Sequence, residues 1–138
     1  MERDRAAPRC HSAGMARTST IECGAAAEAA AARYLQAQGL RVLARNLRCR
    51  AGELDLVCLD GGVLVIVEVR HRATSDFGGA LASVTRRKQR KLIRATLFHW
   101  QRRAAWRARA LRFDVIAVQG RPDGTHHTQW IRDAFRVT

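Results

Sequence analysis

Two acidic side chains interrupt the most hydrophobic part of the sequence. Glu68 lies inside the β-branched run 63–70, and such a run predicts a strand buried on both faces. Asp55 lies in the preceding apolar segment, 53–59, and Asp60-Gly61-Gly62 between the two segments predicts a tight hairpin turn. Because a charged group in apolar surroundings costs several kcal/mol, both carboxylates need a compensating partner.

The hairpin determines which side chains meet. If Gly61 and Gly62 form a two-residue turn, Asp60 pairs with Val63, and Asp55 then lies opposite Glu68 on the same face of the sheet. Like charges in that position repel, so the pair requires a cation. Oxygen ligands without His or Cys favour Mg²⁺ or Mn²⁺, and we therefore expect one of these ions as the cofactor.

Ion pairs offer an alternative explanation of the same acids. The predicted register places Glu53 opposite Arg70, and Glu68 can pair with Arg70 or Arg72. The spacing alone leaves the metal site and the ion pairs both open.

The charge of the chain predicts an anionic partner. The formal net charge of the 138 residues is +13, and nucleic acid is the commonest partner of a basic protein. No acidic residue occurs between Phe77 and Phe113. A genome-wide preference for Arg accounts for part of the total charge, but less well for this local absence of acids. We expect the basic residues near the start of this stretch to contact nucleic acid, and these are Arg86, Arg87, Arg90, Lys91 and Arg94.

Several classes of protein are disfavoured. The four cysteines have no C-x-x-C spacing, so a zinc site is not expected. No apolar run approaches about 18 residues and no apolar signal segment occurs near Met1, which predicts a cytoplasmic protein without a membrane partner. Residues 1–18 are polar and aperiodic, so we expect a disordered tail before a domain at 19–138.

The order of predicted elements indicates a single α/β domain with a mixed sheet flanked by helices. The first helix opens at a capping box, Ser19 with Glu22, and ends near Gln38. A second, long helix covers about 81–105. The predicted strands are 41–48, 53–59, 63–70, 111–119 and 129–133.

Each predicted helix carries a polar residue in its apolar stripe. Glu28 falls in the first stripe, which consists of Ile21, Ala25, Glu28, Ala32 and Leu35. Lys88 falls in the second, which consists of Leu81, Val84, Lys88, Leu92, Ala95 and His99. Lys88 is either a lysine whose stem covers apolar surface or a side chain that reaches toward the two carboxylates.

Four segments together resemble a known family. GELDL at 52–56, EVRHR at 68–72, TRRKQ at 85–89 and RFDV at 112–115 resemble the YraN-type family of bacterial proteins. That family is similar to the restriction-endonuclease-like, PD-(D/E)xK nucleases and particularly to archaeal Holliday-junction resolvases. The likeness covers about 19–135 and implies an αβββαβ core with a metal-dependent phosphodiesterase site.

The resemblance also implies roles for individual residues. Glu28, Asp55 and Glu68 fall on the metal-ligand positions, while Arg70 falls where the family pattern has lysine. Arginine stays charged and is a poor general base, although it can stabilise charge on a phosphate.

Three outcomes therefore stay open. Arg70 serves in catalysis, Lys88 supplies the missing ammonium, or the site binds nucleic acid without cutting it. The expected activity is endonuclease-like action on DNA. The alternatives are a non-catalytic binding module on a degenerate nuclease fold and a metal-free protein associated with RNA. The sequence leaves open whether the protein forms a homodimer.

Overall fold

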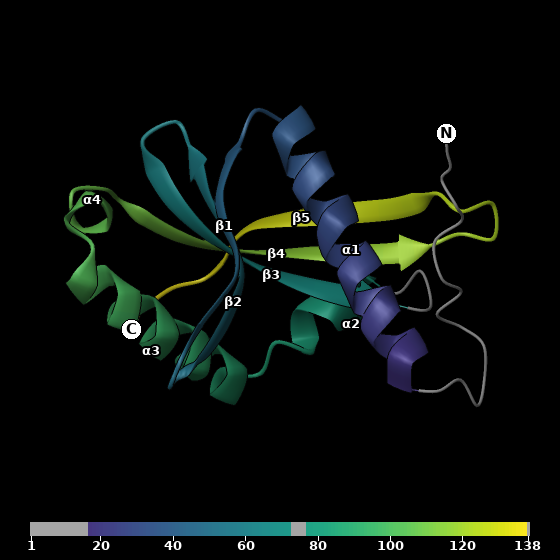
Figure 1. Cartoon of the computed structure of the whole chain (residues 1–138), viewed down its shortest axis with the longest axis horizontal. Coiled ribbons are helices and arrows are strands. Elements are labelled where there is room, and N and C mark those ends of the chain that lie inside the picture. Colours follow the sequence, from purple (N-terminus) through teal and green to yellow (C-terminus); the bar gives the residue numbers. More distant parts are fainter. Residues whose placement is uncertain (1–16, 73–76, 138) are drawn as a thin grey trace.

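Five strands form one mixed sheet in the spatial order β1-β2-β3-β4-β5 (Figure 1). The structure is a computed structural model that describes residues 17–72 and 77–137. The strands are β1 Arg41–Cys49, β2 Gly52–Asp60, β3 Val63–Arg72, β4 Leu111–Gly120 and β5 His126–Phe135. The helices are α1 Arg17–Ala37, α2 Phe77–Ala82, α3 Arg86–Arg102 and α4 Ala104–Arg107.

The predicted hairpin is present with the predicted register. Asp60 pairs with Val63, and the antiparallel ladder continues to the pair Leu56 and Val67. Gly61 has a φ of 62°, a left-handed conformation that glycine adopts without steric cost. The chain then crosses over through the three helices α2 to α4, and β4 joins β3 in parallel.

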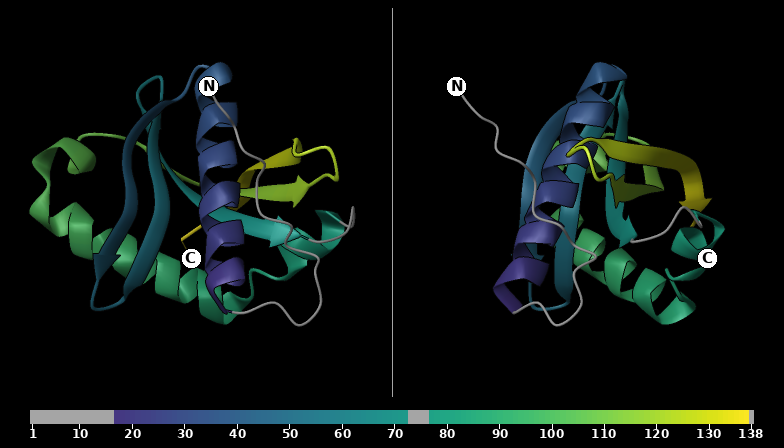
Figure 2. Two further views of the ribbon diagram at one scale, coloured as in Figure 1. Left: turned by 45° about the vertical axis from the view of Figure 1, so that its right-hand side comes forward. Right: turned by 90° about the vertical axis from the view of Figure 1, so that its right-hand side faces the viewer.

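The sheet separates two apolar layers (Figure 2). Helix α1 packs on one face, where Ala31 and Leu35 contact the side chains of β2, β3 and β4. Helices α3 and α4 pack on the other face, where Leu92 and Trp106 contact Leu64 and neighbouring strand residues. The expected single α/β domain with an αβββαβ core is confirmed.

The prediction of one helix over 81–105 is wrong, because the chain forms three helices there. Thr85 is extended, with ψ of 166°, and its hydroxyl accepts a hydrogen bond from the Lys88 backbone N–H at 3.2 Å. This is a helix N-cap, and it starts α3 as a new helix. Arg103 is also extended and ends α3. The predicted stripe holds from Val84 onward, whereas Leu81 belongs to α2 and is exposed.

Three further expectations need correction. Helix α1 begins at Arg17, so Ser19 is not its N-cap, since nothing between these residues stops a helix. The predicted stripe of α1 is buried at Ala32 and Leu35 but not at Ala25, which is exposed, and Ala27 and Ala31 are buried instead. Strand β5 is longer than 129–133 because it pairs with β4 from His126 to Ile131 and again at Phe135. Residues 1–16, most of the predicted tail, lie outside the described residues.

Candidate nucleic-acid and metal site

The two predicted carboxylates meet where β2 separates from β3. The backbone ladder stops at Leu56 and Val67, one residue before the predicted pair of Asp55 and Glu68. There Asp55 Oδ2 accepts a hydrogen bond from the Val69 backbone N–H at 3.0 Å. The Asp55 side chain thus takes the place of a backbone acceptor. This bond fixes its carboxylate beside β3 at the position where the strands diverge.

Glu68 is buried, and its two oxygens have different environments. Its side chain is only 4% exposed. Oε2 lies 3.2 Å from Arg70 Nη1 and 3.6 Å from Lys88 Nζ. Oε1 is buried, and no amide, guanidinium, ammonium or hydroxyl group of the described structure donates to it; the neighbouring Asp55 carboxyl can donate a hydrogen bond to Glu68 only when it is protonated. An unsatisfied carboxylate oxygen in the interior is costly, so this atom has spare capacity to bind a donor or a cation.

The pKa of Asp55 is raised by its position in the interior beside Glu68. Burial of the carboxyl and, next, the charge of Glu68 raise the pKa of Asp55 from the ordinary 3.8 to about 7. The Val69 N–H opposes this rise but does not cancel it. Two carboxyl groups that share one enclosed space cannot both ionise easily, and a cation between them would relieve the repulsion.

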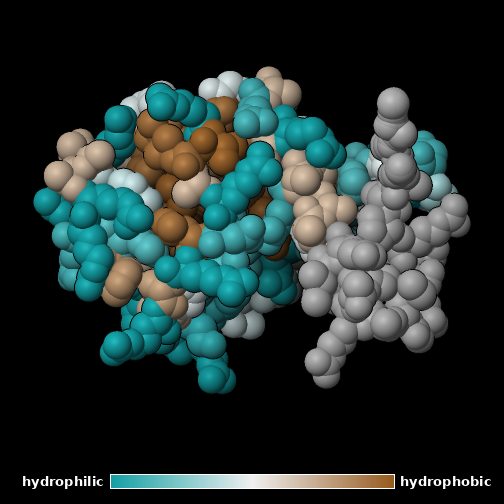
Figure 3. Space-filling view, viewed as in Figure 1, coloured by the Kyte–Doolittle hydropathy of each residue, from teal (hydrophilic) through white to brown (hydrophobic). Residues whose placement is uncertain are grey.

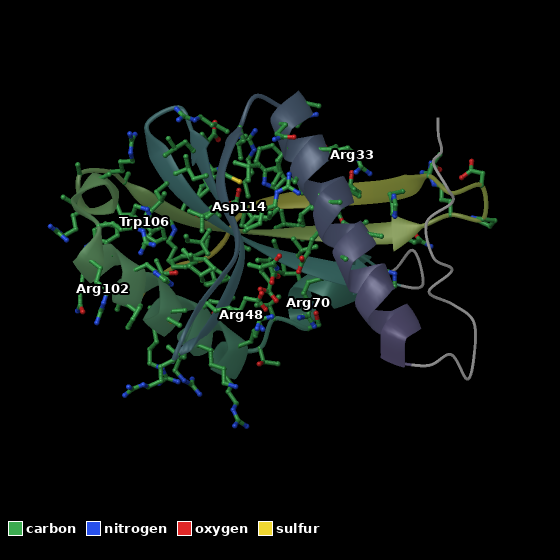
Figure 4. All side chains as sticks on the ribbon, viewed as in Figure 1. Arg33, Arg48, Arg70, Arg102, Trp106 and Asp114 are labelled. Carbon is green, nitrogen blue, oxygen red and sulfur yellow. The ribbon has the colours of Figure 1, made fainter. Side chains whose placement is uncertain are left out.

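Arg70 and Lys88 are held on the Glu68 side by the junction of α2 and α3. Arg70 Nε donates to Ser83 Oγ at 3.0 Å, while its Nη1 contacts Glu68. Lys88 lies in the first turn of α3, which the Thr85 cap orients. In Figure 4 oxygen atoms gather beside Arg70, close to the start of α3. The break in the predicted long helix is therefore what directs Lys88 toward Glu68.

Glu28 does not join the other two acids in one ligand cluster. Its Oε1 accepts a hydrogen bond from Asn46 Nδ2 at 2.9 Å. Burial and the charges of Asp55 and Glu53 still raise the pKa of Glu28 above 4.5, although the Asn46 bond opposes this. Within the described part of the chain, no three or more His, Cys, Asp or Glu side chains are grouped as possible metal ligands.

Two residues beside the site were not anticipated. Asn46 lies in β1 between the paired residues Arg45 and Leu47, next to Asp55, with a φ of 50°. Asparagine tolerates this conformation better than most residues do. An asparagine inside a predicted strand was therefore the one feature of the sequence that could have indicated an irregular position there. Ser83 precedes the Thr85 cap, but nothing in its sequence context indicated the bond to Arg70.

The predicted ion pairs are present only in part. Glu68 pairs with Arg70, as one alternative stated. Glu53 contacts Arg48 of β1 at 3.6 Å, and no pair between Glu53 and Arg70 occurs in the described structure. The strands diverge before the register can bring Glu53 and Arg70 together.

Comparison with known proteins identifies relatives over most of the chain. The model of Uncharacterised protein family UPF0102 matches residues 27–118, a range that includes Glu28, Asp55, Glu68, Arg70 and Lys88. A UPF0102 protein of Pseudomonas putida strain F1 is 49% identical over 88% of this chain and 98% of its own length. The chain belongs to the UPF0102 family. A UPF0102 protein of Pseudomonas syringae pv. syringae is 47% identical and one of Pseudomonas fluorescens 45%, with the same shares covered.

This UPF0102 protein carries exposed positive charge directly beside the carboxylates. Lys88 points toward Glu68, while the other basic residues of the same helix are exposed. These exposed residues are Arg86, Arg87, Arg90, Lys91, Arg94 and Arg102. Figure 3 shows mostly hydrophilic residues over the region of α3. No helix in the described part of the chain is long and apolar enough to cross a membrane.

The donor set of this UPF0102 site fits Mg²⁺ or Mn²⁺. The side chains that meet are carboxylates, with no thiol or imidazole among the contacts of Glu68 and Asp55. Mg²⁺ typically uses one or two protein carboxylates and completes its coordination with water and substrate phosphate. The buried Glu68 Oε1, which has no donor, supplies the free lone pairs that such an ion needs.

Proposed function

We propose that this UPF0102 protein hydrolyses phosphodiester bonds of DNA at the Asp55–Glu68 site with Mg²⁺ or Mn²⁺. One observation supports this most strongly. A buried carboxylate has one oxygen without a donor, faces a second carboxyl whose pKa is about 7, and is flanked by two cations. Structural ion pairs leave the second carboxylate without a role, whereas a divalent ion between the two carboxylates would relieve their repulsion.

Asp55 and Glu68 would hold the ion, which when bound polarises the phosphate and makes its water ligand more acidic. Glu28 is bonded to Asn46 and adds negative potential from α1. We therefore propose that Glu28 acts on the ion through its charge at longer range and not as a direct ligand. Val69 keeps Asp55 in place through its N–H.

Arg70 and Lys88 divide the remaining tasks. Arg70 is fixed by Ser83 and Glu68, so it is suited to contact a phosphate oxygen and to stabilise charge that develops there. The Lys88 ammonium is 3.6 Å from Glu68 and its side chain is 40% exposed, so it can reach both the carboxylate and an incoming phosphate. Lys88 is thus our candidate for the lysine that the strand lacks.

The exposed arginines of α3 would bind the flanking backbone. Contacts to phosphates position nucleic acid without reading its sequence, so we expect binding that depends on DNA shape more than on sequence. A second candidate is a module that binds DNA without cutting it. It is favoured by Arg70 at the lysine position and by the separation of Glu28 from the other acids.

The test is cleavage of supercoiled, single-stranded and four-way-junction DNA, with Mn²⁺ and with EDTA. Wild-type protein should cut at least one substrate in Mn²⁺, and Asp55→Asn should not. Asp123→Asn is a matched control, because it changes the same charge in the exposed turn before β5. If the wild type binds DNA but cuts none of these substrates in Mn²⁺, the enzyme proposal fails and the binding module replaces it.

A further inference from the structure

A second feature lies on α3, at a distance from the carboxylates. A hollow of about 750 Å³ opens between the tip of the β1–β2 hairpin and the C-terminal half of α3. Its size falls in the range of ligand pockets. Apolar and cationic side chains share its lining, among them Arg50, Ala51, Arg94, Leu97, Phe98 and Arg102.

The arginine at one end of this hollow lies over an aromatic ring. The guanidinium carbon of Arg102 lies 3.7 Å from the centre of the Phe98 ring. Arg102 Nη1 also donates to the Phe98 carbonyl at 2.8 Å, which holds the group in place. The guanidinium group therefore lies over the ring of Phe98, and Arg102 is itself exposed.

The floor of the hollow is apolar and open to solvent. Leu97 is 42% exposed, one of four large apolar side chains that are exposed within the described structure. Its neighbours in the hollow carry three positive charges, on Arg50, Arg94 and Arg102. Such a lining suits a flat, partly apolar group attached to an anion, which is the chemical character of a nucleotide.

We propose that this hollow holds an unpaired base of the DNA strand that runs from the Asp55–Glu68 site along α3. The inference rests on the proposed function and deepens it, because it specifies a substrate with a single-stranded segment. Arg102 would stack on the base, as guanidinium planes do in single-strand recognition. Arg50 and Arg94 would contact the adjacent phosphates.

The spacing along α3 agrees with one continuous strand. Lys88 at the carboxylates and Arg94 at the near edge of the hollow are six residues apart, which is about 9 Å of helix, and Arg102 is about 21 Å from Lys88. Nucleotides of a duplex strand rise about 3.4 Å each, so the interval corresponds to several nucleotides. Figure 4 shows Arg70 and Arg102 in separate parts of the molecule, Arg70 by the carboxylates and Arg102 farther along α3.

A fully paired duplex would not use this lining. Its bases are stacked inside, and its outer surface presents phosphates to arginines without a group to cover Leu97 and Phe98. An unpaired base presents both an apolar face and hydrogen-bonding edges. The hollow therefore favours DNA with a single-stranded segment over duplex DNA with the same number of phosphates.

The experiment compares two fluorescent DNA strands of twelve nucleotides in EDTA, so that no cleavage occurs. One is a thymidine oligomer and the other has the same phosphates but abasic sugars. Wild-type protein should bind the normal strand at least about fivefold more tightly, which corresponds to the loss of one stacking contact. A duplex of equal phosphate number completes the set.

Two variants remove the hollow's contributions separately. Arg102→Lys keeps the charge but removes the guanidinium plane. Leu97→Gln removes apolar surface without changing charge. The control variants Arg41→Lys and Leu43→Gln make the same exchanges at exposed positions of β1 that do not line the hollow. The exposed fraction of Leu43, 40%, is similar to the 42% of Leu97.

The inference is supported if Arg102→Lys and Leu97→Gln lose most of the preference for the normal strand while both control variants keep it. It is overturned if the wild type binds the abasic strand equally well, or if the hollow variants retain the preference. Cleavage in Mn²⁺ without any base preference would overturn this inference alone. Base preference without cleavage of any DNA would instead overturn the phosphodiesterase proposal.

Discussion

Two buried acids of this sheet differ in how completely they are bonded. Asp114 of β4 is fully buried, and its oxygens accept hydrogen bonds from Arg112, from the Trp130 indole and from the Asp133 backbone N–H, all within 2.8–3.0 Å. Glu68 of the neighbouring strand is almost as buried, yet one of its oxygens has no donor in the described structure.

The difference separates two roles for a buried charge. The Asp114 cluster is closed: Arg112 also contacts Asp60, so β4 and the β2–β3 hairpin are fixed to one another. Asp114 forms an ion pair with Arg112 at 2.9 Å. The Glu68 cluster is incomplete and beside exposed cations, and a second carboxyl shares its space. We interpret Asp114 as structural and Glu68 as part of the proposed metal site.

The largest expected effect tests the incomplete cluster. Lys88→Ala should lower the cleavage rate in Mn²⁺ at saturating DNA by about 10²–10⁴-fold, the usual loss for a proton-transfer or charge-stabilising group. The fold should remain stable because Arg70 still contacts Glu68.

The matched variant is Lys91→Ala, which removes the only other lysine of the chain from the exposed side of the same helix. Its effect should be on DNA affinity and not on the rate at saturation. Arg70→Lys should be neutral or activating, since it restores the lysine of the family pattern. Equal rates for wild type and Lys88→Ala would remove Lys88 from the proposed chemistry.

A substitution in the closed cluster around Asp114 should lower the stability of the fold. Asp114→Ala should lower the free energy of unfolding by about 3–5 kcal/mol, because it leaves the Trp130 indole and the Asp133 N–H without their acceptor and Arg112 with Asp60 alone. Asp55→Asn should have no such cost in EDTA and should raise stability, since it removes a repelled carboxylate. Urea unfolding at pH 7.5 measures both. A similar loss in the two variants would contradict the proposed difference between the clusters.

Sequence reasoning located the incomplete cluster because its signals are local. The Gly61–Gly62 turn fixes the register, and alternation along the strands then places Asp55 and Glu68 together. The charge of α3 and the polar position of Lys88 in its stripe can likewise be recognised within one segment.

The parts that could not be predicted depend on contacts between distant segments. The separation of β2 from β3 allows Asp55 to bond Val69, and no single segment encodes that divergence. Ser83 contacts Arg70 only after the predicted helix is broken, because Thr85 bonds better as a cap than within a helix. Two of the donors to Asp114, the Trp130 indole and the Asp133 N–H, come from β5, the second nineteen positions away.

Metal should stabilise the incomplete cluster and leave the closed one unaffected. At a hundredfold excess of Mn²⁺ over its dissociation constant, the free energy of unfolding should rise by about 2.7 kcal/mol. Asp55→Asn should lose this increment, whereas Asp123→Asn should keep it, since Asp123 lies in the exposed β4–β5 turn. Thermal melts in EDTA and in Mn²⁺ measure the shift. Equal shifts in wild type and Asp55→Asn would rule out an ion at these carboxylates.

The smallest effect is a dependence of stability on pH that the Asp55 carboxyl should cause. The pKa of Asp55 is about 7 in the folded protein and 3.8 ordinarily, because of burial and the charge of Glu68. Between these values the folded state holds a proton that the unfolded state has released. This proton therefore makes its full contribution to the free energy of unfolding below about pH 4. The contribution is lost as the pH rises to about 7, and the free energy of unfolding then falls by at most about 1.4 kcal/mol per pH unit.

Other groups titrate in or near the same range, so the comparison must be made with a variant. Burial lowers the pKa of His99 and of His126, which gives the opposite slope, while the raised pKa of Glu28 adds to that of Asp55. Urea unfolding of wild type and Asp55→Asn in EDTA at pH 5, 6, 7 and 8 isolates the Asp55 contribution as the difference between the two curves. The variant should gain stability relative to wild type as the pH rises. Added Mn²⁺ should reverse that gain above pH 7, because the ion competes with the proton for the same carboxylate. Parallel curves would mean that Asp55 ionises in the folded protein as it does in water, and the carboxylate pair would then give no reason to expect a metal.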